Sequence, residues 1–348
     1  MNQTHIWKDI LWQDNIVQIL QKHLIAPVNA FLFIGPPGSN KEVAAKIFAT
    51  ALLCKNNGCG SCTSCLSAQN NIHSDLIEVQ RTGASLSVAQ AREVTEQANR
   101  MPSVGNRRVI ILPEFHLVDD AAPALLKTIE ESLASTFFII LADSITPQLV
   151  TIASRCVNIQ FNTLTEKQIL EYLLSQDIKA EKAERIARCC GQNIDKAIEA
   201  IKDKSIIERY ELWYSIPKNL NRKGATIDSL VSSVLDATEQ TIAYLDKKHE
   251  KEIEENNELA KEKRSSVTKT DLTARFKREQ RKVRTDELRY GLKALSDSYR
   301  DVGLKTNPKA IEEALDYIDN ASLLLSRNVT ESLLLQALFI QLANIEFS

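Results

Sequence analysis

The sequence lacks any long hydrophobic run. No apolar stretch approaches the roughly 18–20 residues that a membrane-spanning helix needs, so no membrane segment is predicted. The first residues lack a basic segment followed by an apolar one, and a cytoplasmic location without a secretory signal is therefore expected. Internal repeats and low-complexity tracts are also missing.

An excess of charge of one sign is missing as well. Lysine and arginine number 43 against 45 aspartate and glutamate, which gives a net charge of −2. This balance argues against a protein that coats nucleic acid by bulk charge and leaves only a local basic face for such contacts. With 44% hydrophobic and 25% charged residues in 348, the composition is that of a globular protein. Its length predicts two or three domains of roughly 100–200 residues each.

Short apolar segments alternate with helical ones over the first part of the chain. The segments predicted as strands are 30–34, 75–79, 108–112, 136–141 and 157–161. The segments predicted as helices between them are 41–53, 88–101 and 121–131. Short apolar strands that alternate with helices predict an α/β domain whose parallel sheet is covered by helices on both faces.

The strand pattern stops near residue 163, and helical segments follow. We therefore predict an α/β domain over 1–163, a small helical lid over 164–205 and an all-helical domain over 206–348. Within the last part, residues 246–289 are almost entirely polar, with acidic residues first and basic residues later. The favoured interpretation is a solvated helical hairpin or a partly mobile insertion, and the alternative is a basic arm that touches DNA or a partner.

A phosphate-binding loop is indicated between the first strand and the helix that follows it. Residues 35–42 read Gly-Pro-Pro-Gly-Ser-Asn-Lys-Glu, in the strand-to-helix context that a Walker A loop requires. Gly35 and Lys41 match that motif, and Gly38 lies between them. These three residues are the candidates for nucleotide binding, since backbone N–H groups and a lysine hold the phosphates in such loops.

Both halves of the corresponding ATP site are altered. Asn40 replaces the glycine before the lysine, and Glu42 replaces the Ser or Thr whose hydroxyl binds Mg²⁺. After the third strand, Pro113 stands where the metal-binding carboxylate of a Walker B segment is expected, and Glu114 follows it. Asparagine tolerates left-handed backbone geometry, so the loop is expected to keep its shape. A loop without catalysis is the favoured interpretation, and weak nucleotide binding is the alternative.

A cluster of cysteines indicates a metal site. Four of the seven cysteines are Cys54, Cys59, Cys62 and Cys65. A cytoplasmic protein keeps its thiols reduced, so a tight cluster indicates metal binding before disulfides. Zn²⁺ favours tetrahedral sulfur ligation, and four protein ligands predict a structural zinc; free thiols and an iron–sulfur cluster are the alternatives. His73 is expected on the surface, and Cys189 and Cys190 are expected to be packing residues.

Several segments together resemble one known family. They are residues 31–38, the cysteine module, 89–94, 105–111, 124–131 and 154–156. Over residues 1 to about 205, the sequence is similar to the clamp-loader subunits of bacterial DNA polymerase III, which belong to the AAA+ superfamily. The resemblance implies an α/β P-loop domain with a parallel sheet, a small helical lid and an all-α C-terminal collar domain. It also implies a place in an open ring of AAA+ subunits that uses ATP to load the sliding clamp onto primed DNA.

Within this family, the altered ATP site resembles that of the delta-prime subunits rather than the gamma/tau motor subunits. The resemblance implies a stator that has no ATPase activity of its own and contributes an arginine to a neighbouring subunit. Arg155 occupies that position, where a guanidinium would stabilise charge on the transferred phosphate. The alternative for Arg155 is a pair with a carboxylate of its own chain. Asp143 falls in the sensor-1 region, and Lys196 lies near the arginine of sensor 2.

The resemblance also implies the partners. A gamma/tau-like subunit is expected on the face that carries Arg155, and a delta-like subunit is expected at the collar. The sliding clamp and primed DNA are expected to be reached through the complex. Two other functions stay open: a gamma/tau-like or other DNA-dependent AAA+ ATPase that works despite Asn40 and Glu42, and a DNA-binding module that uses the basic stretch.

Overall fold

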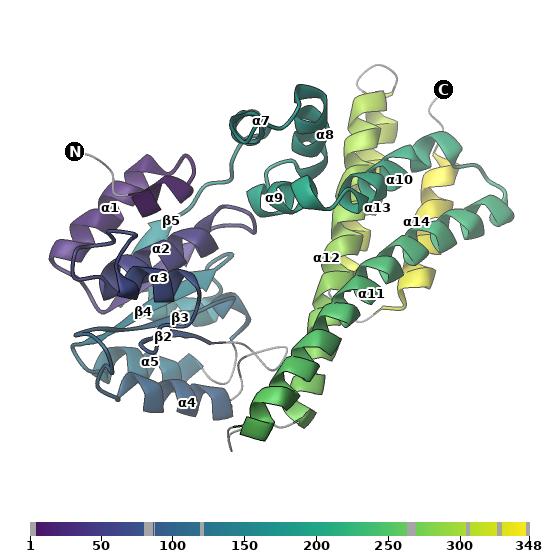
Figure 1. The fold of residues 1–348 in the computed structure, drawn as a ribbon. Helices are drawn as coiled ribbons and strands as arrows, with labels where there is room; N and C mark the ends of the chain where they lie inside the picture. The colour runs from purple at the N-terminus through teal and green to yellow at the C-terminus, as the bar shows by residue number, and fades with distance from the viewer. Residues whose placement is uncertain are drawn as a thin grey trace. The chain divides into compact units, whose positions relative to one another are not determined.

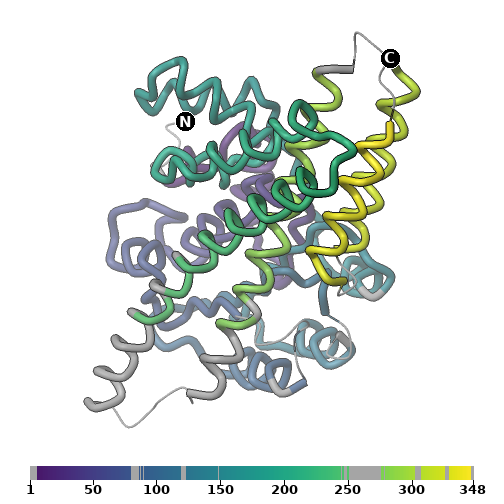
Figure 2. The backbone as a smooth tube through the Cα atoms, turned by 90° about the vertical axis from the view of Figure 1, so that its right-hand side faces the viewer, coloured from purple at the N-terminus to yellow at the C-terminus, as the bar shows by residue number. Residues whose placement is uncertain are grey.

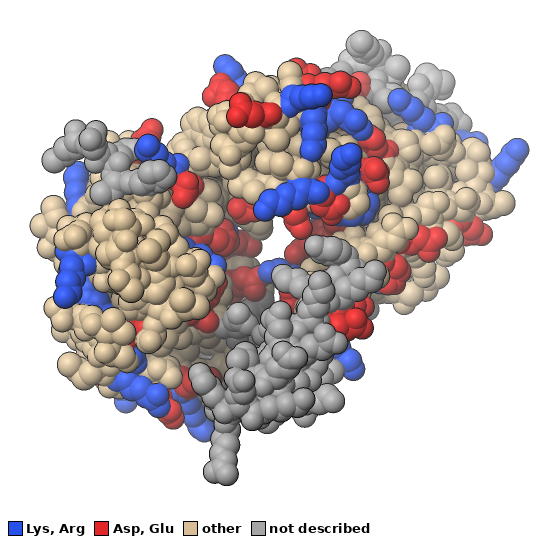
Figure 3. All heavy atoms as spheres, in the orientation of Figure 1, with Lys and Arg blue, Asp and Glu red and all other residues tan. Residues whose placement is uncertain are grey.

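The computed structural model describes residues 5–79, 86, 88–118, 122–262, 269–303, 307–325 and 329–345. The chain divides into two compact units, Met1–Glu199 and Ala200–Ser348 (Figure 1). Every helix among the described residues is too short or too polar to cross a membrane. On the surface that faces the viewer in Figure 3, basic side chains are interspersed with acidic ones, in keeping with the balanced composition.

A five-stranded parallel sheet forms the centre of the first unit (Figure 1). Its strands are β1 (Ala30–Ile34), β2 (Leu76–Glu78), β3 (Arg108–Leu112), β4 (Thr136–Ala142) and β5 (Val157–Gln160). Their order across the sheet is β2-β3-β4-β1-β5, and each neighbouring pair is parallel. The parallel sheet and all of its predicted strands are therefore confirmed, with small differences at the strand ends.

Helices cover the sheet on both faces, as the apolar strands predict (Figure 1). The covering elements are η1 (His5–Asp9), α1 (Asp14–Ile25), α2 (Lys41–Leu53), α3 (Thr63–Gln69), α4 (Val88–Ala98), η2 (Phe115–Leu117), α5 (Ala122–Glu131), η3 (Pro147–Leu149) and α6 (Val150–Ala153). Successive side chains of a strand point to opposite faces. Phe31 and Phe33 of β1 therefore join the core beneath α1 and α2, whereas Leu32 joins the core that includes α4 and α5.

Three short helices follow β5, and the last of them extends past Glu199, where the first unit ends. They are α7 (Glu166–Ser175), α8 (Ala180–Cys190) and α9 (Ile194–Lys202). The first begins with a capping box, in which the Thr165 hydroxyl accepts from the Gln168 N–H and the Gln168 side chain accepts from the Thr165 N–H. Cys189 and Cys190 are buried in α8, which confirms that they are packing residues. The division into domain, lid and collar at residues 163 and 205 stays a prediction.

The described part of the second unit is all-helical. Its helices are α10 (Ser205–Asn219), α11 (Gly224–Glu262), α12 (Lys269–Gly303), α13 (Pro308–Leu324) and α14 (Glu331–Asn344). The long helices α11 and α12 lie against each other (Figure 2), and the His249 ring stacks on Phe276 at 3.9 Å between centroids. This arrangement agrees with the helical hairpin predicted over 246–289. Residues 263–268 and the side chains of 251–275, on which the basic-arm alternative partly depends, lie outside the described residues.

Candidate functional site

The loop between β1 and α2 keeps the left-handed turn that a phosphate-binding loop needs. Asn40 precedes α2 with φ 69° and ψ 13°, in the left-handed region. Asparagine enters this region at lower cost than most side chains, which confirms that the loop can form without the usual glycine. The Asn40 Oδ1 accepts a hydrogen bond from the Leu11 N–H at 2.9 Å. The asparagine that stands in place of the usual glycine therefore links the loop to the segment between η1 and α1.

Lys41 is the centre of a closed charge network. Its side chain is only 2% exposed, and its Nζ lies 3.0 Å from Glu42 Oε1 and 3.0 Å from Asp143 Oδ1. The same nitrogen donates to the Pro36 carbonyl oxygen at 3.2 Å. The ammonium thus has two ion-pair partners and one hydrogen-bond acceptor within its own chain. The lysine that reaches the outer phosphates in an intact Walker A loop is here satisfied by its own chain.

The start of α9 packs directly on the same loop. Gly38 has a φ of 75°, and a Cβ at this position would stand 2.3 Å from the Asn193 Oδ1. The Ile194 N–H donates to the Gly38 carbonyl oxygen at 3.4 Å, and the Asn193 Oδ1 accepts from the Lys196 N–H at 2.9 Å. Gly35 is tied to the sheet, since its N–H donates to the Ala142 carbonyl oxygen at 3.1 Å. All three predicted loop residues are therefore held by protein contacts.

A further carboxyl group lies within electrostatic reach of the loop. The pKa of Asp195 is raised, because burial disfavours its charged form and Glu42 repels it, although Lys41 acts in the opposite direction. Even without Asp195, the carboxylates of Glu42 and Asp143 outnumber the single ammonium of Lys41. Negative charge at this place opposes the approach of a polyphosphate.

Sequence reasoning missed a histidine that supports Asp143. The Asp143 N–H donates to His116 Nδ1 at 3.1 Å. The His116 Nε2 lies 3.5 Å from Asp143 Oδ2, the carboxylate oxygen that does not contact Lys41. His116 follows β3 by a few residues and belongs to η2. In the sequence, His116 follows the altered Walker B residues Pro113 and Glu114. This position is the sequence feature that could have indicated a role for His116.

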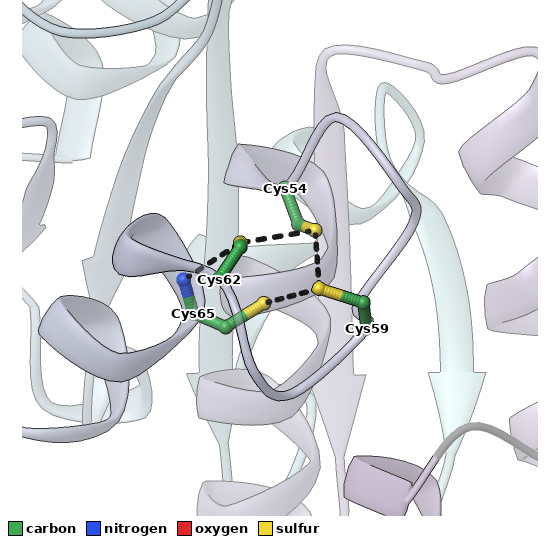
Figure 4. Close-up of side chains that lie close together, drawn as sticks. All are labelled: Cys54, Cys59, Cys62 and Cys65. Carbon is green, nitrogen blue, oxygen red and sulfur yellow. Dashed lines mark hydrogen bonds between the residues drawn. The ribbon is translucent and has the colours of Figure 1, made fainter.

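The four cysteines of the predicted metal site converge (Figure 4). Cys54 ends α2, Cys62 precedes α3, Cys59 lies between the two helices and Cys65 lies in α3. Their sulfur atoms all lie within 4.8 Å of one another, with Cys54 Sγ 3.7 Å from those of Cys59 and Cys62. Four sulfurs at about 2.3 Å from one zinc ion would stand about 3.8 Å apart at the corners of a tetrahedron. The residues therefore fit a four-cysteine metal centre.

Local hydrogen bonds favour thiolates in part of this cluster. The Asn56 N–H donates to Cys54 Sγ at 3.3 Å. Hydrogen bonds led by the Ser61 N–H lower the pKa of Cys59 to about 6, whereas burial raises the pKa of Cys65. A bound cation would favour the thiolate form of every ligand, because it compensates the charge that burial disfavours.

His73 is buried at 6% exposure, so the prediction that it lies on the surface is wrong. Its Nε2 lies 2.9 Å from the Ser64 Oγ, and its Nδ1 accepts a hydrogen bond from the Asp75 N–H at 3.1 Å. Ser64 belongs to α3, between two of the cysteines. The histidine therefore connects the cysteine module to the segment that enters β2. Each of its ring nitrogens has a hydrogen-bond partner, which offsets the desolvation cost of burying it.

Arg155 lies on the surface, just after α6, with 43% of its side chain exposed. Its Nε donates to the Glu130 carboxylate, and its Nη1 donates to the Thr151 carbonyl oxygen at 2.9 Å and the Ser154 Oγ at 3.2 Å. Within the chain, the arginine thus makes the carboxylate pair that the alternative interpretation predicts. The sequence motif gave no indication of Glu130 as its partner.

Comparisons with known proteins relate residues 12–165 to the family described as "DNA polymerase III, delta subunit". The DNA polymerase III subunit tau of Bacillus subtilis is 32% identical over 171 residues, which cover 47% of this chain and 30% of that protein. The subunit delta' of the same organism is 29% identical over 184 residues, which cover 52% of this chain and 56% of that protein. The matched part of the chain thus spans less than two thirds of either relative.

A solved structure extends the likeness of fold to nearly the whole chain. A DNA polymerase III gamma subunit-related protein from Thermotoga maritima matches with a TM-score of 0.51 at 14% identity. The match covers 94% of this chain and 99% of that one. At this identity the likeness concerns the fold: an α/β domain followed by helices.

Proposed function

Through residues 12–165 the chain belongs to the AAA+ clamp-loader subunits of DNA polymerase III, and we propose that it acts as the delta-prime-like stator of the loader. In this role it neither binds nor hydrolyses ATP at its own loop. It supports the ATP-driven loading of the sliding clamp onto primed DNA by supplying Arg155 to the ATP site of a neighbouring subunit. Its partners are a gamma/tau-like and a delta-like subunit, and it reaches the clamp and DNA through the complex.

The observation that carries this proposal is the closed network around Lys41. Two carboxylates pair with its ammonium, and the Pro36 carbonyl oxygen accepts a hydrogen bond from it. For ATP to bind, its phosphates would have to displace Glu42 and Asp143, while the Mg²⁺ ligand expected at residue 42 is missing. A loop in this state is suited to a subunit that contributes to ATP hydrolysis in a neighbouring subunit but does not hydrolyse ATP itself.

A gamma/tau-like motor subunit is the second candidate, because the tau subunit of Bacillus subtilis matches at 32% identity. The tau and delta' subunits of that organism match at similar identity over 47% and 52% of this chain, so identity does not separate the two roles. The residues that do separate them are Asn40 and Glu42 in the loop and Pro113 just after β3. Asn40, Glu42 and Pro113 all depart from an ATPase site and favour the stator.

We further propose that the four cysteines bind one structural zinc ion. When bound, the ion would close the turn between α2 and α3 with four protein ligands, which leaves no open position for catalysis. Its contribution would be to stability, since the short segment around Cys59 has few apolar side chains to hold it.

Two measurements test the stator proposal. The first is equilibrium binding of labelled ATP with Mg²⁺ to the isolated chain, together with its own ATPase rate; neither is expected. The second is the ATPase rate of a complex reconstituted with gamma/tau-like and delta-like subunits, with either wild-type chain or Arg155→Ala. Arg155→Ala should abolish the share of the rate that comes from the site it serves, because a trans arginine contributes a factor of about 10³–10⁵.

Arg100→Ala is the matched control, because Arg100 is also an exposed arginine of the first unit. It should leave the rate of the complex unchanged. Tight ATP binding with turnover by the isolated chain would support the motor subunit instead. An unchanged rate with Arg155→Ala in an assembled complex would overturn the role of Arg155.

A further inference from the structure

We infer that Glu130 is a positioning residue for Arg155: its carboxylate holds one edge of the guanidinium so that the opposite edge faces an anion on a neighbouring subunit. The inference rests on the proposed function of Arg155 in trans. It assigns a role to a side chain that has no place in the motif around residues 154–156.

The hydrogen bonds of the guanidinium carry the inference. Arginine has five N–H donors in a rigid planar fork. The Nε–H is used by Glu130, and the two N–H donors of Nη1 are used by the Thr151 carbonyl oxygen and the Ser154 hydroxyl. The two donors of Nη2 have no hydrogen-bond partner among the described residues. The chain therefore fixes the plane of the fork and leaves one edge for an external acceptor.

The two partners are fixed by the same hydrophobic core. Glu130 lies in α5 next to Ile129, and Arg155 follows α6, which contains Ile152. Ile129 and Ile152 are 6% and 1% exposed and belong to the core cluster on one face of the sheet. A carboxylate placed by a packed helix can orient a guanidinium that would otherwise sample many rotamers.

The exposure of the pair indicates that Glu130 orients Arg155 and does not sequester it. Both side chains are about two-fifths exposed, and an ion pair of this exposure is weak. Glu130 therefore does not trap the arginine away from a phosphate. Its contact with Nε lowers the rotamer freedom that Arg155 must lose when Nη2 meets an anionic oxygen.

Glu131 provides a matched control. It is the next residue of α5, is 67% exposed and lies 3.9 Å from the Nζ of Lys127 rather than near Arg155. Substitution of Glu131 removes the same charge from the same helix turn. A general electrostatic effect on the surface would affect both glutamates, whereas positioning of Arg155 depends on Glu130 alone.

The test uses the reconstituted complex with Glu130→Ala, Glu130→Gln, Glu131→Ala or Arg155→Ala in this chain. Glu130→Ala should lower kcat at the site served by Arg155 by about tenfold and leave the KM for ATP unchanged, since misplacement of a group can cost up to about a hundredfold. Glu130→Gln should retain most of the rate, because its amide oxygen still accepts from Nε. Glu131→Ala should match wild type, and thermal unfolding should confirm that all variants fold.

The outcomes separate the inference from the proposed function. If Arg155→Ala lowers the rate and Glu130→Ala behaves like Glu131→Ala, Glu130 has no positioning role, while the function of Arg155 stands. A rise in rate with Glu130→Ala would mean that the carboxylate restrains the arginine, which also overturns the inference. If Arg155→Ala has no effect, the proposed function itself fails.

Discussion

The Nζ of Lys41, at the start of α2, lies 3.0 Å from a carboxylate oxygen of Asp143, just past the end of β4. Strands β1 and β4 are neighbours, so the loop after β1 and the residues after β4 meet at the same edge of the sheet. At this carboxyl edge, open α/β proteins bind their ligands. The contact therefore places a charge of the chain itself where a nucleotide site would hold phosphate.

We expect Asp143→Ala to destabilise the first unit. Lys41 is buried, and the loss of one of its two carboxylate partners leaves its charge less compensated. Loss of one partner of a buried polar group costs about 1–3 kcal/mol, which urea unfolding of the isolated chain would measure. The exposed Glu131→Ala is the control and should cost less than about 0.5 kcal/mol. An equally small effect of Asp143→Ala would show that Lys41 is compensated by other groups.

The double substitution Asn40→Gly with Glu42→Thr should restore ATP binding. Threonine at 42 supplies the hydroxyl that binds Mg²⁺ and removes one of the acceptors that hold Lys41. Titration with labelled ATP should give an affinity at least about tenfold above that of wild type, equivalent to about 1.4 kcal/mol. Asn40→Gly alone keeps Glu42 and should bind no better than wild type. No gain in the double variant would contradict the view that residue 42 is the main obstacle to nucleotide.

The sheet could be predicted from the sequence because its strands are apolar on both faces. In β1, for example, Phe31, Leu32 and Phe33 are all fully buried, so a short apolar run marked the strand without any alternation. The altered phosphate loop could also be predicted, since its shape depends on a few residues that are adjacent in the chain. The four cysteines likewise converge because one short segment, residues 54–65, contains them.

The partners of the charged side chains could not be predicted in the same way. Lys41 finds Asp143, and Arg155 finds Glu130, through tertiary packing that brings together the ends of separate strands and helices. His73 lies in a polar stretch, which is typical of a surface, yet its two ring nitrogens find partners that allow burial. Hydropathy reports the composition of a segment and contains no information about such distant partners.

The isolated chain should contain about one zinc ion, which elemental analysis would measure. Cys59→Ser should lose the metal and lower the midpoint of thermal unfolding, because binding to the folded state contributes to stability. Cys189→Ser is the control: it changes a buried cysteine outside the cluster and should keep the metal content of wild type. A wild-type chain that folds without zinc and is indifferent to a chelator would contradict the metal centre.

The stability of the first unit should depend on pH through Asp75. This fully buried carboxylate accepts hydrogen bonds from the Ser103 N–H at 2.6 Å, the Val104 N–H at 2.8 Å and the Arg108 guanidinium at 3.2 Å. Burial alone would raise its pKa, but these hydrogen bonds outweigh burial and lower the pKa below its ordinary value. The carboxylate thus stabilises the fold above the pKa of the unfolded chain, about 3.9, and this contribution is lost as the pH falls through the folded pKa.

Asp75→Asn should therefore cost the most at neutral pH. The variant keeps one acceptor oxygen but loses the charge opposite Arg108, and the cost of breaking such a buried pair is about 3–5 kcal/mol. Urea unfolding at pH 7, 5 and 3 should show a difference in the free energy of unfolding that shrinks toward pH 3, where the wild-type carboxylate begins to be protonated in the unfolded chain. Glu131→Gln, at an exposed site of the same unit, should show no such trend. A difference for Asp75→Asn that stays constant across this range would mean that hydrogen-bond geometry, and not the charge of Asp75, is what the buried site requires.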